Sequence, residues 1–313
     1  MTSKLPADLE RILRKSENAE LLALLVEGLS GSDLNTLLLK VFKERAKQCS
    51  ASDLLKRYRD NRFVHPATVD PLLLKQLEMD VLNVAANHSI TPVQLSPVAP
   101  FGASSAVGTV DQNKVISALR GTEVVSDATN LLALHIADRI KATRPPAKRE
   151  GFLRFCTTHR HVRAQFFGDA PGMMPHFQLF CIVTAGLDEG SYRFEKQSFG
   201  EHLLVYRDFF AKRFGSEIEI VISPRGGYKD ADGLVARIAQ HVEEQAMKIR
   251  VTKGPPDSGN PYYKGLQFTI RTLINGKSHD IGDGGFDDWT QKMLGNRKER
   301  LLISAIGLDR LLM

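Results

Sequence analysis

The sequence has few cysteines, a single tryptophan and no long apolar run. Its three cysteines, Cys49, Cys156 and Cys181, are odd in number and widely separated. This excludes a disulfide framework and a CxxC metal site, and it indicates a reducing, cytoplasmic setting. The aliphatic run Leu21–Val26 is far shorter than the about 20 residues that a membrane-spanning helix needs. Because charged residues already occur between Lys4 and Arg11, neither a secretory signal nor a membrane anchor is expected.

The short signatures of common enzyme classes are missing as well. GxxxxGK(S/T), GxGxxG, HExxH and GxSxG do not occur, so P-loop NTPases, Rossmann oxidoreductases, zincins and standard α/β-hydrolases lose their main support. What remains is a chain of 313 residues with 42% hydrophobic and 25% charged residues, a balance typical of globular proteins. At about 150 residues per domain, this length predicts one large domain or two ordinary ones.

Positive charge is in mild excess and unevenly spread. Forty-two Lys and Arg against thirty-six Asp and Glu give a net charge of +6. Between Arg139 and Arg163, Glu150 is the only acidic residue among many basic ones. Two interpretations stay open: a solvated basic surface, or a surface that faces phosphates, including those of RNA. The second predicts an RNA affinity that falls steeply with salt.

The sequence pattern changes near residue 90, from helical periodicity to a mixture of strand-like and helical runs. Residues 6–86 have helical periodicity, with Ser30 and Ser32 as candidate caps and further helices at 52–60 and 71–87. We therefore expect a helical N-terminal domain over 1–89, in which we find no chemistry, and a second domain over 90–313. In the second domain, short strand-like runs mix with helical ones, and the runs at 248–253, 265–274 and 279–281 follow one another without a helix between them. A regular βαβ array is excluded, and an α+β fold with a mainly antiparallel sheet flanked by helices is predicted.

Two segments near the C-terminus combine glycine with charge. Residues 303–311 read as a small-residue strand that delivers Gly307 and then Arg310 at the start of a helix, a geometry suited to binding an anion. Residues 283–288 read as a glycine turn with three carboxylates just before another helix. Each pattern alone is a weak signal, because an Asp-rich glycine turn is more often a capped loop than a site. Their order along the chain is the informative feature.

That order resembles the catalytic core of class II aminoacyl-tRNA synthetases, most of all the histidyl-type enzymes and their stand-alone paralogues. Residues 305–311, AIGLDRL, are similar to the third motif of the family. Residues 284–288, GGFDD, resemble the histidyl-type GGRYD, and residues 264–268, KGLQF, stand where that type has RGLDYY. The resemblance covers roughly residues 90–313 and implies a class II synthetase-like sheet, ATP and Mg²⁺ as cofactors, and a homodimer formed through residues 97–108 and the following helix.

The resemblance also implies roles for individual residues. Catalytic roles fall to Arg160 at the α-phosphate of ATP, to Arg310 at the γ-phosphate, and to Lys264. The remaining implied contacts are Phe177, Gln178 and Gly307 for the nucleotide, and Asp127, Thr129, Gln267, Gly284, Gly285 and Asp288 for the acid substrate. Arginine is chemically suited to the two phosphate-binding roles. A carboxylate that attacks an α-phosphorus must overcome the repulsion between two anions, and a guanidinium can bind two phosphate oxygens at once. The sequence does not identify metal ligands.

Departures from the family pattern limit what can be carried over. Val162 stands where the second motif has an acidic residue, and Lys264 and Gln267 replace an Arg and an Asp. Because both tyrosines of the histidyl pattern are absent from their positions, histidine is not expected as the substrate. Only three residues follow Arg310, so we expect no C-terminal anticodon-binding domain and no ordinary tRNA charging.

The leading hypothesis from the sequence is a stand-alone enzyme that activates an amino acid or similar small carboxylic acid as its adenylate. The alternative is a non-catalytic histidyl-type paralogue that acts as a regulatory or binding subunit. RNA binding through the basic run from Arg139 to Arg163 is a third possibility.

Overall fold

The computed structural model describes residues 6–143, 151–166, 168, 174–245, 247–256, 262–274 and 276–312. The chain divides into two compact units: residues 1–62 together with 118–122, and residues 63–117 together with 123–313. Residues 71–87, which the sequence groups with the N-terminal helices, pack within the second unit. The expected domain division after residue 89 stays a prediction.

The first unit consists of short helices. They are α1 (Ala7–Lys15), α2 (Leu21–Ala23), the π-helix η1 (Leu24–Gly28), α3 (Gly31–Lys47) and α4 (Ala51–Asp60). The Ser30 side chain caps α3 by accepting from the Asp33 backbone N–H, as the sequence predicts, and Ser50 and Asp53 form a capping box on α4. None of these helices has a buried residue. Local capping rather than core packing therefore defines this unit.

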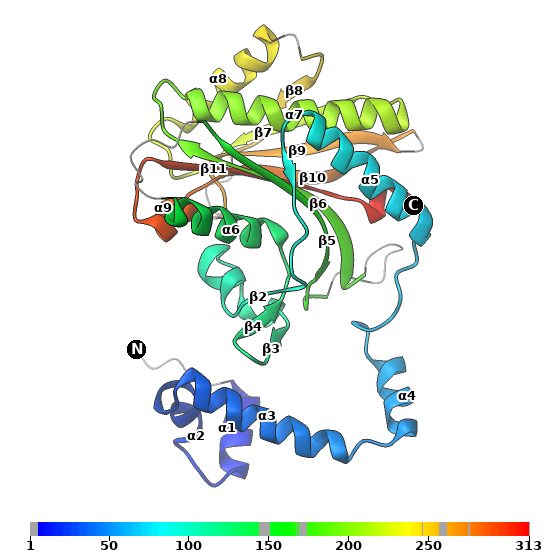
Figure 1. Cartoon of the computed structure of the whole chain (residues 1–313), viewed down its shortest axis with the longest axis vertical. Helices are drawn as coiled ribbons and strands as arrows, with labels where there is room; N and C mark the ends of the chain where they lie inside the picture. Colours follow the sequence, from blue (N-terminus) through cyan, green and yellow to red (C-terminus); the bar gives the residue numbers. More distant parts are fainter. Residues whose placement is uncertain are drawn as a thin grey trace. The chain divides into compact units, whose positions relative to one another are not determined.

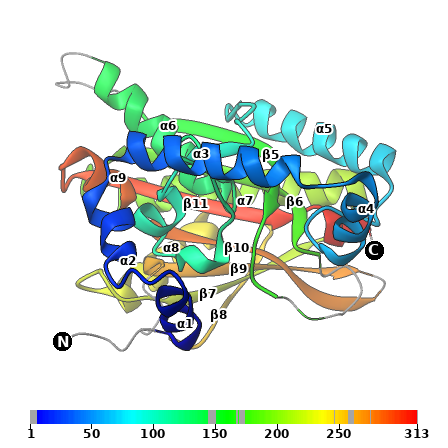
Figure 2. The same ribbon diagram turned by 90° about the horizontal axis from the view of Figure 1, so that it is seen from below.

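The second unit is built around an eight-stranded sheet in the order β1-β5-β6-β11-β10-β9-β7-β8, which can be followed in Figure 2. These strands are β1 (Thr91–Pro92), β5 (Leu153–Val162), β6 (His176–Leu187), β7 (Ile218–Pro224), β8 (Arg250–Lys253), β9 (Lys264–Ile274), β10 (Lys277–Asp287) and β11 (Glu299–Gly307). The edge strands β1 and β8 pair parallel with β5 and β7, and all the pairs between are antiparallel. The predicted mainly antiparallel sheet is confirmed.

Helices cover both faces of this sheet. Figure 1 shows α5 (Pro71–Asn87), α7 (Arg193–Phe214) and α8 (Ala231–Glu244) on one side, with α6 (Ala128–Ala142) and α9 (Trp289–Leu294) on the other. A smaller sheet, β2-β4-β3, consists of β2 (Val98–Pro100), β3 (Ser117–Ala118) and β4 (Thr122–Val124). The remaining turns are η2 (Ala103–Val107), η3 (Gln112–Lys114) and η5 (Asp309–Leu312). No helix of the described ranges combines the length and the apolar character needed to cross a membrane.

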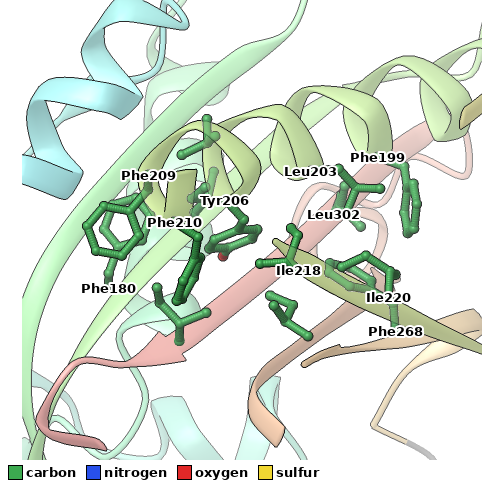
Figure 3. Packing of buried hydrophobic residues seen from close by; sticks show 14 of the residues in the cluster. Phe180, Phe199, Leu203, Tyr206, Phe209, Phe210, Ile218, Ile220, Phe268 and Leu302 are labelled. Carbon is green, nitrogen blue, oxygen red and sulfur yellow. The ribbon is translucent and has the colours of Figure 1, made fainter. Parts of the chain in front are cut away.

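Apolar side chains form one core on each face. On the side of α5 and α7, which we call the core face, Phe180, Tyr206, Phe268 and Leu302 belong to the larger cluster (Figure 3). Successive residues of a strand point to opposite faces, so their neighbours Cys181 and Ile303 belong to the other cluster, beneath α6. We call that second side the cavity face.

One predicted local structure is wrong. Residues 283–287 form no turn but the last part of β10, paired with β9 and β11. The reason is close packing: a Cβ at Gly284 would lie 2.5 Å from the Phe268 ring and from the Ile303 carbonyl oxygen. These glycines let three strands approach one another instead of reversing the chain.

Candidate active site

A cavity of about 260 Å³ lies on the cavity face, where the start of β6, the middle of β10 and the end of β11 meet the start of α6. Six of the predicted site residues line it: Asp127, Thr129, Phe177, Gln178, Gly307 and Arg310. They come from segments far apart in the sequence, and the sheet brings them to one wall. A neighbouring cavity of about 410 Å³ shares the residues around Asp127 and continues toward Lys114.

Asp127 forms the acidic end of the cavity. Its Oδ1 accepts from the Thr129 backbone N–H at 2.9 Å and from the Thr129 hydroxyl at 2.7 Å, which makes it the N-cap of α6. Its Oδ2 accepts from the Tyr262 hydroxyl at 2.9 Å and lies 3.9 Å from an Arg163 nitrogen. Burial would raise the pKa of Asp127, but the charge of Arg163 and the Thr129 hydrogen bonds outweigh burial and hold that pKa below its usual range. A carboxylate is therefore maintained at this end.

Arg163 supplies a cation inside the cavity, and sequence analysis gave it no role. Its guanidinium carbon lies 5.2 Å from the centre of the Phe177 ring, and its Nε donates to the Ser126 carbonyl at 3.1 Å. The neighbouring His161 accepts from the Ala128 backbone N–H at 2.6 Å. Burial lowers the pKa of His161, so this ring stays neutral. Arg163 and Asp127 are then the charged groups at this wall of the cavity.

Arg160 is not part of the cavity wall. Its Nε donates to His176 Nδ1 at 2.9 Å, and its Nη2 lies 3.6 Å from Asp309 Oδ2. Its strand neighbour Thr158 donates to Glu78 of α5 at 2.9 Å, which identifies this side of β5 as the core face. Arg310 lines the cavity and donates to the Asp280 carbonyl at 3.2 Å. The structure therefore does not bring Arg160 and Arg310 to one cavity wall, although Asp309, which touches Arg160, does line it.

Asp283 is a second carboxylate in the cavity. Its Oδ2 accepts from Gln267 Nε2 at 3.2 Å, and the Oε1 of Gln267 accepts from Arg225. Burial, followed by the charge of Asp127, raises the pKa of Asp283 against the hydrogen bond from Tyr263. Gln267 thus reaches the site through Asp283, without lining the cavity.

The other predicted substrate-binding residues support the site from outside its wall. A Cβ at Gly285 would lie 2.5 Å from the Tyr263 ring, so the missing side chain makes room for a tyrosine that does line the cavity. Asp288 precedes α9 and lies 2.7 Å from the Lys292 ammonium. The side chain of Lys264 packs near Gly227.

The ionisable residues of this cavity wall to which the sequence analysis gave no role are Tyr262, Tyr263, Arg163, Asp283 and Asp309. The two tyrosines stand directly before Lys264, upstream of where the histidyl pattern has its own pair, and this adjacency is the signal that was available. Among the described residues there is no group of three or more His, Cys, Asp and Glu side chains placed to hold a metal ion.

No family model matches the sequence, and no curated protein matches it. Solved structures do match. The histidyl-tRNA synthetase of S. aureus superposes with a TM-score of 0.58 at 12% identity over 78% of this chain and 66% of its own. The RNA-binding domain of threonyl-tRNA synthetase from Cryptosporidium parvum gives 0.60 at 12% identity over 76% and 62%. An ATP phosphoribosyltransferase regulatory subunit/histidyl-tRNA synthetase from Bacillus halodurans gives 0.63 at 13% identity over 80% and 82%.

These similarities confirm the predicted fold: over 78–80% of its length the chain has a class II synthetase-like fold, a mainly antiparallel sheet flanked by helices. The chain spans less than two thirds of the length of the two synthetases named first. At such low identity the similarity concerns the fold, and function has to be argued from the site.

Proposed function

We propose that the cavity binds an amino acid or a similar small acid, and that the chain uses ATP with Mg²⁺ to activate its carboxylate as an acyl-adenylate. The observation that carries this proposal is the distribution of charge along one cavity. Asp127, held by Thr129 and Tyr262, is suited to an ammonium group. Arg310 and Gly307 line the same cavity and are suited to phosphate.

The chemistry requires two anions to meet. The substrate carboxylate attacks the α-phosphorus of ATP, an oxygen–phosphorus bond forms, and pyrophosphate leaves with the electron pair of the bond that breaks. Cations aimed at the phosphates lower this barrier. In this proposal Arg163, on the cavity face, takes the position that motif order gives to Arg160, and Phe177 offers its ring to the adenine.

Mg²⁺ binds carboxylate and phosphate oxygens. Asp309 offers its Oδ1, which is buried and has no hydrogen-bond partner among the residues that the structure describes. It lies in the cavity wall next to Arg310. A carboxylate there fits the ion, and when bound the ion would neutralise phosphate charge.

ATP–pyrophosphate exchange over a panel of amino acids tests the proposal. We expect exchange with at least one amino acid, strongly reduced by Asp127→Asn and Arg310→Ala. Arg193→Ala is the matched control, since that side chain is 71% exposed and pairs only locally with Glu189. If no amino acid supports exchange, the proposed reaction is wrong.

A second function, an amino-acid-binding or regulatory subunit without catalysis, is favoured by the position of Arg160 on the core face. It predicts calorimetric binding of an amino acid that Asp127→Asn abolishes, together with no measurable ATP affinity. ATP binding that depends on Arg310 would exclude it.

The homodimer is also part of the proposal. Phe101, next to Gly102 at the start of η2, is 59% exposed within the segment expected to form the interface. Phe101→Asp is expected to shift the sedimentation coefficient from that of a dimer to that of a monomer.

A further inference from the structure

Asp283 and Asp127 share a cavity but differ in how their charges are balanced. Asp127 has Arg163 3.9 Å from its Oδ2. Asp283 makes no ion pair within the described part of the chain, and its hydrogen bonds come from the neutral donors Gln267 and Tyr263. Of these two carboxylates, Asp127 therefore has a cationic partner within ion-pair distance, and Asp283 has none among the described residues.

A buried carboxylate without a cation is costly, and proteins usually pair it or neutralise it. Gln267 is held in place by Arg225, and Gly285 leaves the space that Tyr263 occupies. Both donors are thus fixed by further contacts. The surroundings of Asp283 position its oxygens at a cavity wall, yet the only cation acting on it there, Arg163, acts from beyond ion-pair distance among the described residues.

We propose that the ligand of this cavity carries a second cationic group, and that Asp283 pairs with it. The substrate class is then an amino acid with a basic side chain, such as lysine, ornithine or arginine. This inference rests on the proposed function, because it assumes that the α-ammonium group of the ligand lies at Asp127.

The aromatic residues beside Asp283 fit the same class. Tyr262 and Tyr263 both line the cavity, and their ring centres lie 4.8 Å apart, edge to face. Burial raises the pKa of both tyrosines, so they remain hydroxyl donors. Ring faces and hydroxyl dipoles stabilise an ammonium or guanidinium group, whereas they offer no positive partner to an acidic side chain.

The pH dependence of ligand affinity provides a second test of a cationic partner for Asp283. The groups that act on Asp283 are Asp127 at the start of α6, Arg163 after β5, Gln267 on β9 and Tyr263 before β9. Burial raises the pKa of Asp283, so a falling pH protonates this carboxyl earlier than an exposed one. A cationic side chain must displace that proton, so its affinity rises with pH, whereas the affinity of a neutral side chain does not.

Isothermal titration calorimetry with matched amino acids tests the inference. L-Lysine is compared with L-norleucine and L-arginine with L-citrulline, on the wild-type protein and on Asp283→Asn. We expect the basic member of at least one pair to bind about tenfold tighter or more, and Asp283→Asn to remove the difference while neutral binding persists. Asp232→Asn, at a side chain that is 77% exposed, is the control and should keep the preference.

The outcomes separate the two proposals. If neutral amino acids bind as tightly as basic ones, or if Asp283→Asn keeps the preference, the inference about substrate class is overturned and the proposed function stands. If no amino acid binds, both are overturned. Should Asp283→Asn fail to fold, the wild-type protein decides: the inference is overturned if lysine loses no affinity relative to norleucine as the pH is lowered.

Discussion

The same strands of the central sheet contribute packing residues to one face and cavity-lining residues to the other. On the core face, Phe180, Phe268 and Leu302 are fully buried beneath helices. On the cavity face, Leu179 and Ile303, the strand neighbours of Phe180 and Leu302, line an open cavity. Because side chains alternate along a strand, a step of one residue separates a position that stabilises the fold from one that faces a ligand.

Arg160 and Arg163 are the sharpest case of this difference. They lie three residues apart, at the end of β5 and just after it, and their guanidinium groups serve opposite faces. Arg160 contacts His176 and Asp309, whereas Arg163 lies over Phe177 beside Asp127. Motif order alone selects the first arginine, and strand alternation selects the second.

We expect the largest loss of folding stability for a substitution on the core face. Phe268→Ala removes a fully buried ring that packs edge to face on Phe199, with ring centres 4.9 Å apart. The free energy of unfolding should fall by about 3–5 kcal/mol, measured by urea denaturation. Phe177→Ala, at a half-buried position on the cavity wall, should cost clearly less stability. Equal losses at both positions would contradict the division between the faces.

Asp287, at the end of β10 on the cavity face, is buried in surroundings that favour its uncharged form. Burial raises its pKa to about 9, and its Oδ2 has no hydrogen-bond partner among the described residues. The unfolded carboxyl titrates near about pH 4, so its protonation stabilises the fold below that pH, and this stability is lost as the pH rises toward 9.

Asp287→Asn keeps the acceptor for the Asp288 and Trp289 backbone N–H groups but does not titrate. We expect this variant to be more stable by about 1–3 kcal/mol at pH 7, with the gain absent at pH 4. Urea denaturation at both pH values measures it, and a variant less stable at pH 7 would contradict the assignment.

The two arginines give a matched pair of variants. Arg163→Met should weaken ligand binding about tenfold, or about 1.4 kcal/mol, because it removes a cation from the cavity. Arg160→Met should mainly reduce stability, since His176 and Asp309 lose their charged partner. Calorimetry and thermal unfolding of both variants test this, and a larger binding defect in Arg160→Met would restore the motif-based assignment.

The smallest effect is expected in the N-terminal unit. Leu55 on α4 is 53% exposed, and no residue of that helix is buried. Leu55→Ala should change the free energy of unfolding by less than about 0.5 kcal/mol. A loss above 1.5 kcal/mol (roughly the range of a buried leucine) would mean that this leucine is covered in the folded protein.

The sequence predicted fold class and element order well, because hydrophobic periodicity and helix caps are local signals. The helix at 71–87 and the cap at Ser30 are confirmed, and β6 is central as its apolar run indicates. The site was predicted in part: motif order led to Asp127, Phe177 and Arg310.

What the sequence could not give depends on packing across strands. Nothing local distinguishes the glycines of β10 from a turn, since their role is to admit Phe268 and Tyr263 from the neighbouring strand. Which face of the sheet the Arg160 side chain lies on likewise depends on the register of β5 against β6. Long-range strand pairing therefore determines both the conformation of the β10 glycines and the face on which Arg160 lies.

A crystal structure with L-lysine and a non-hydrolysable ATP analogue would test the site most directly. We predict the ligand on the cavity face, with its α-ammonium group at Asp127 and the phosphates at Arg310. A nucleotide bound against Arg160 on the core side, or a cavity that stays empty at saturating ligand, would contradict it.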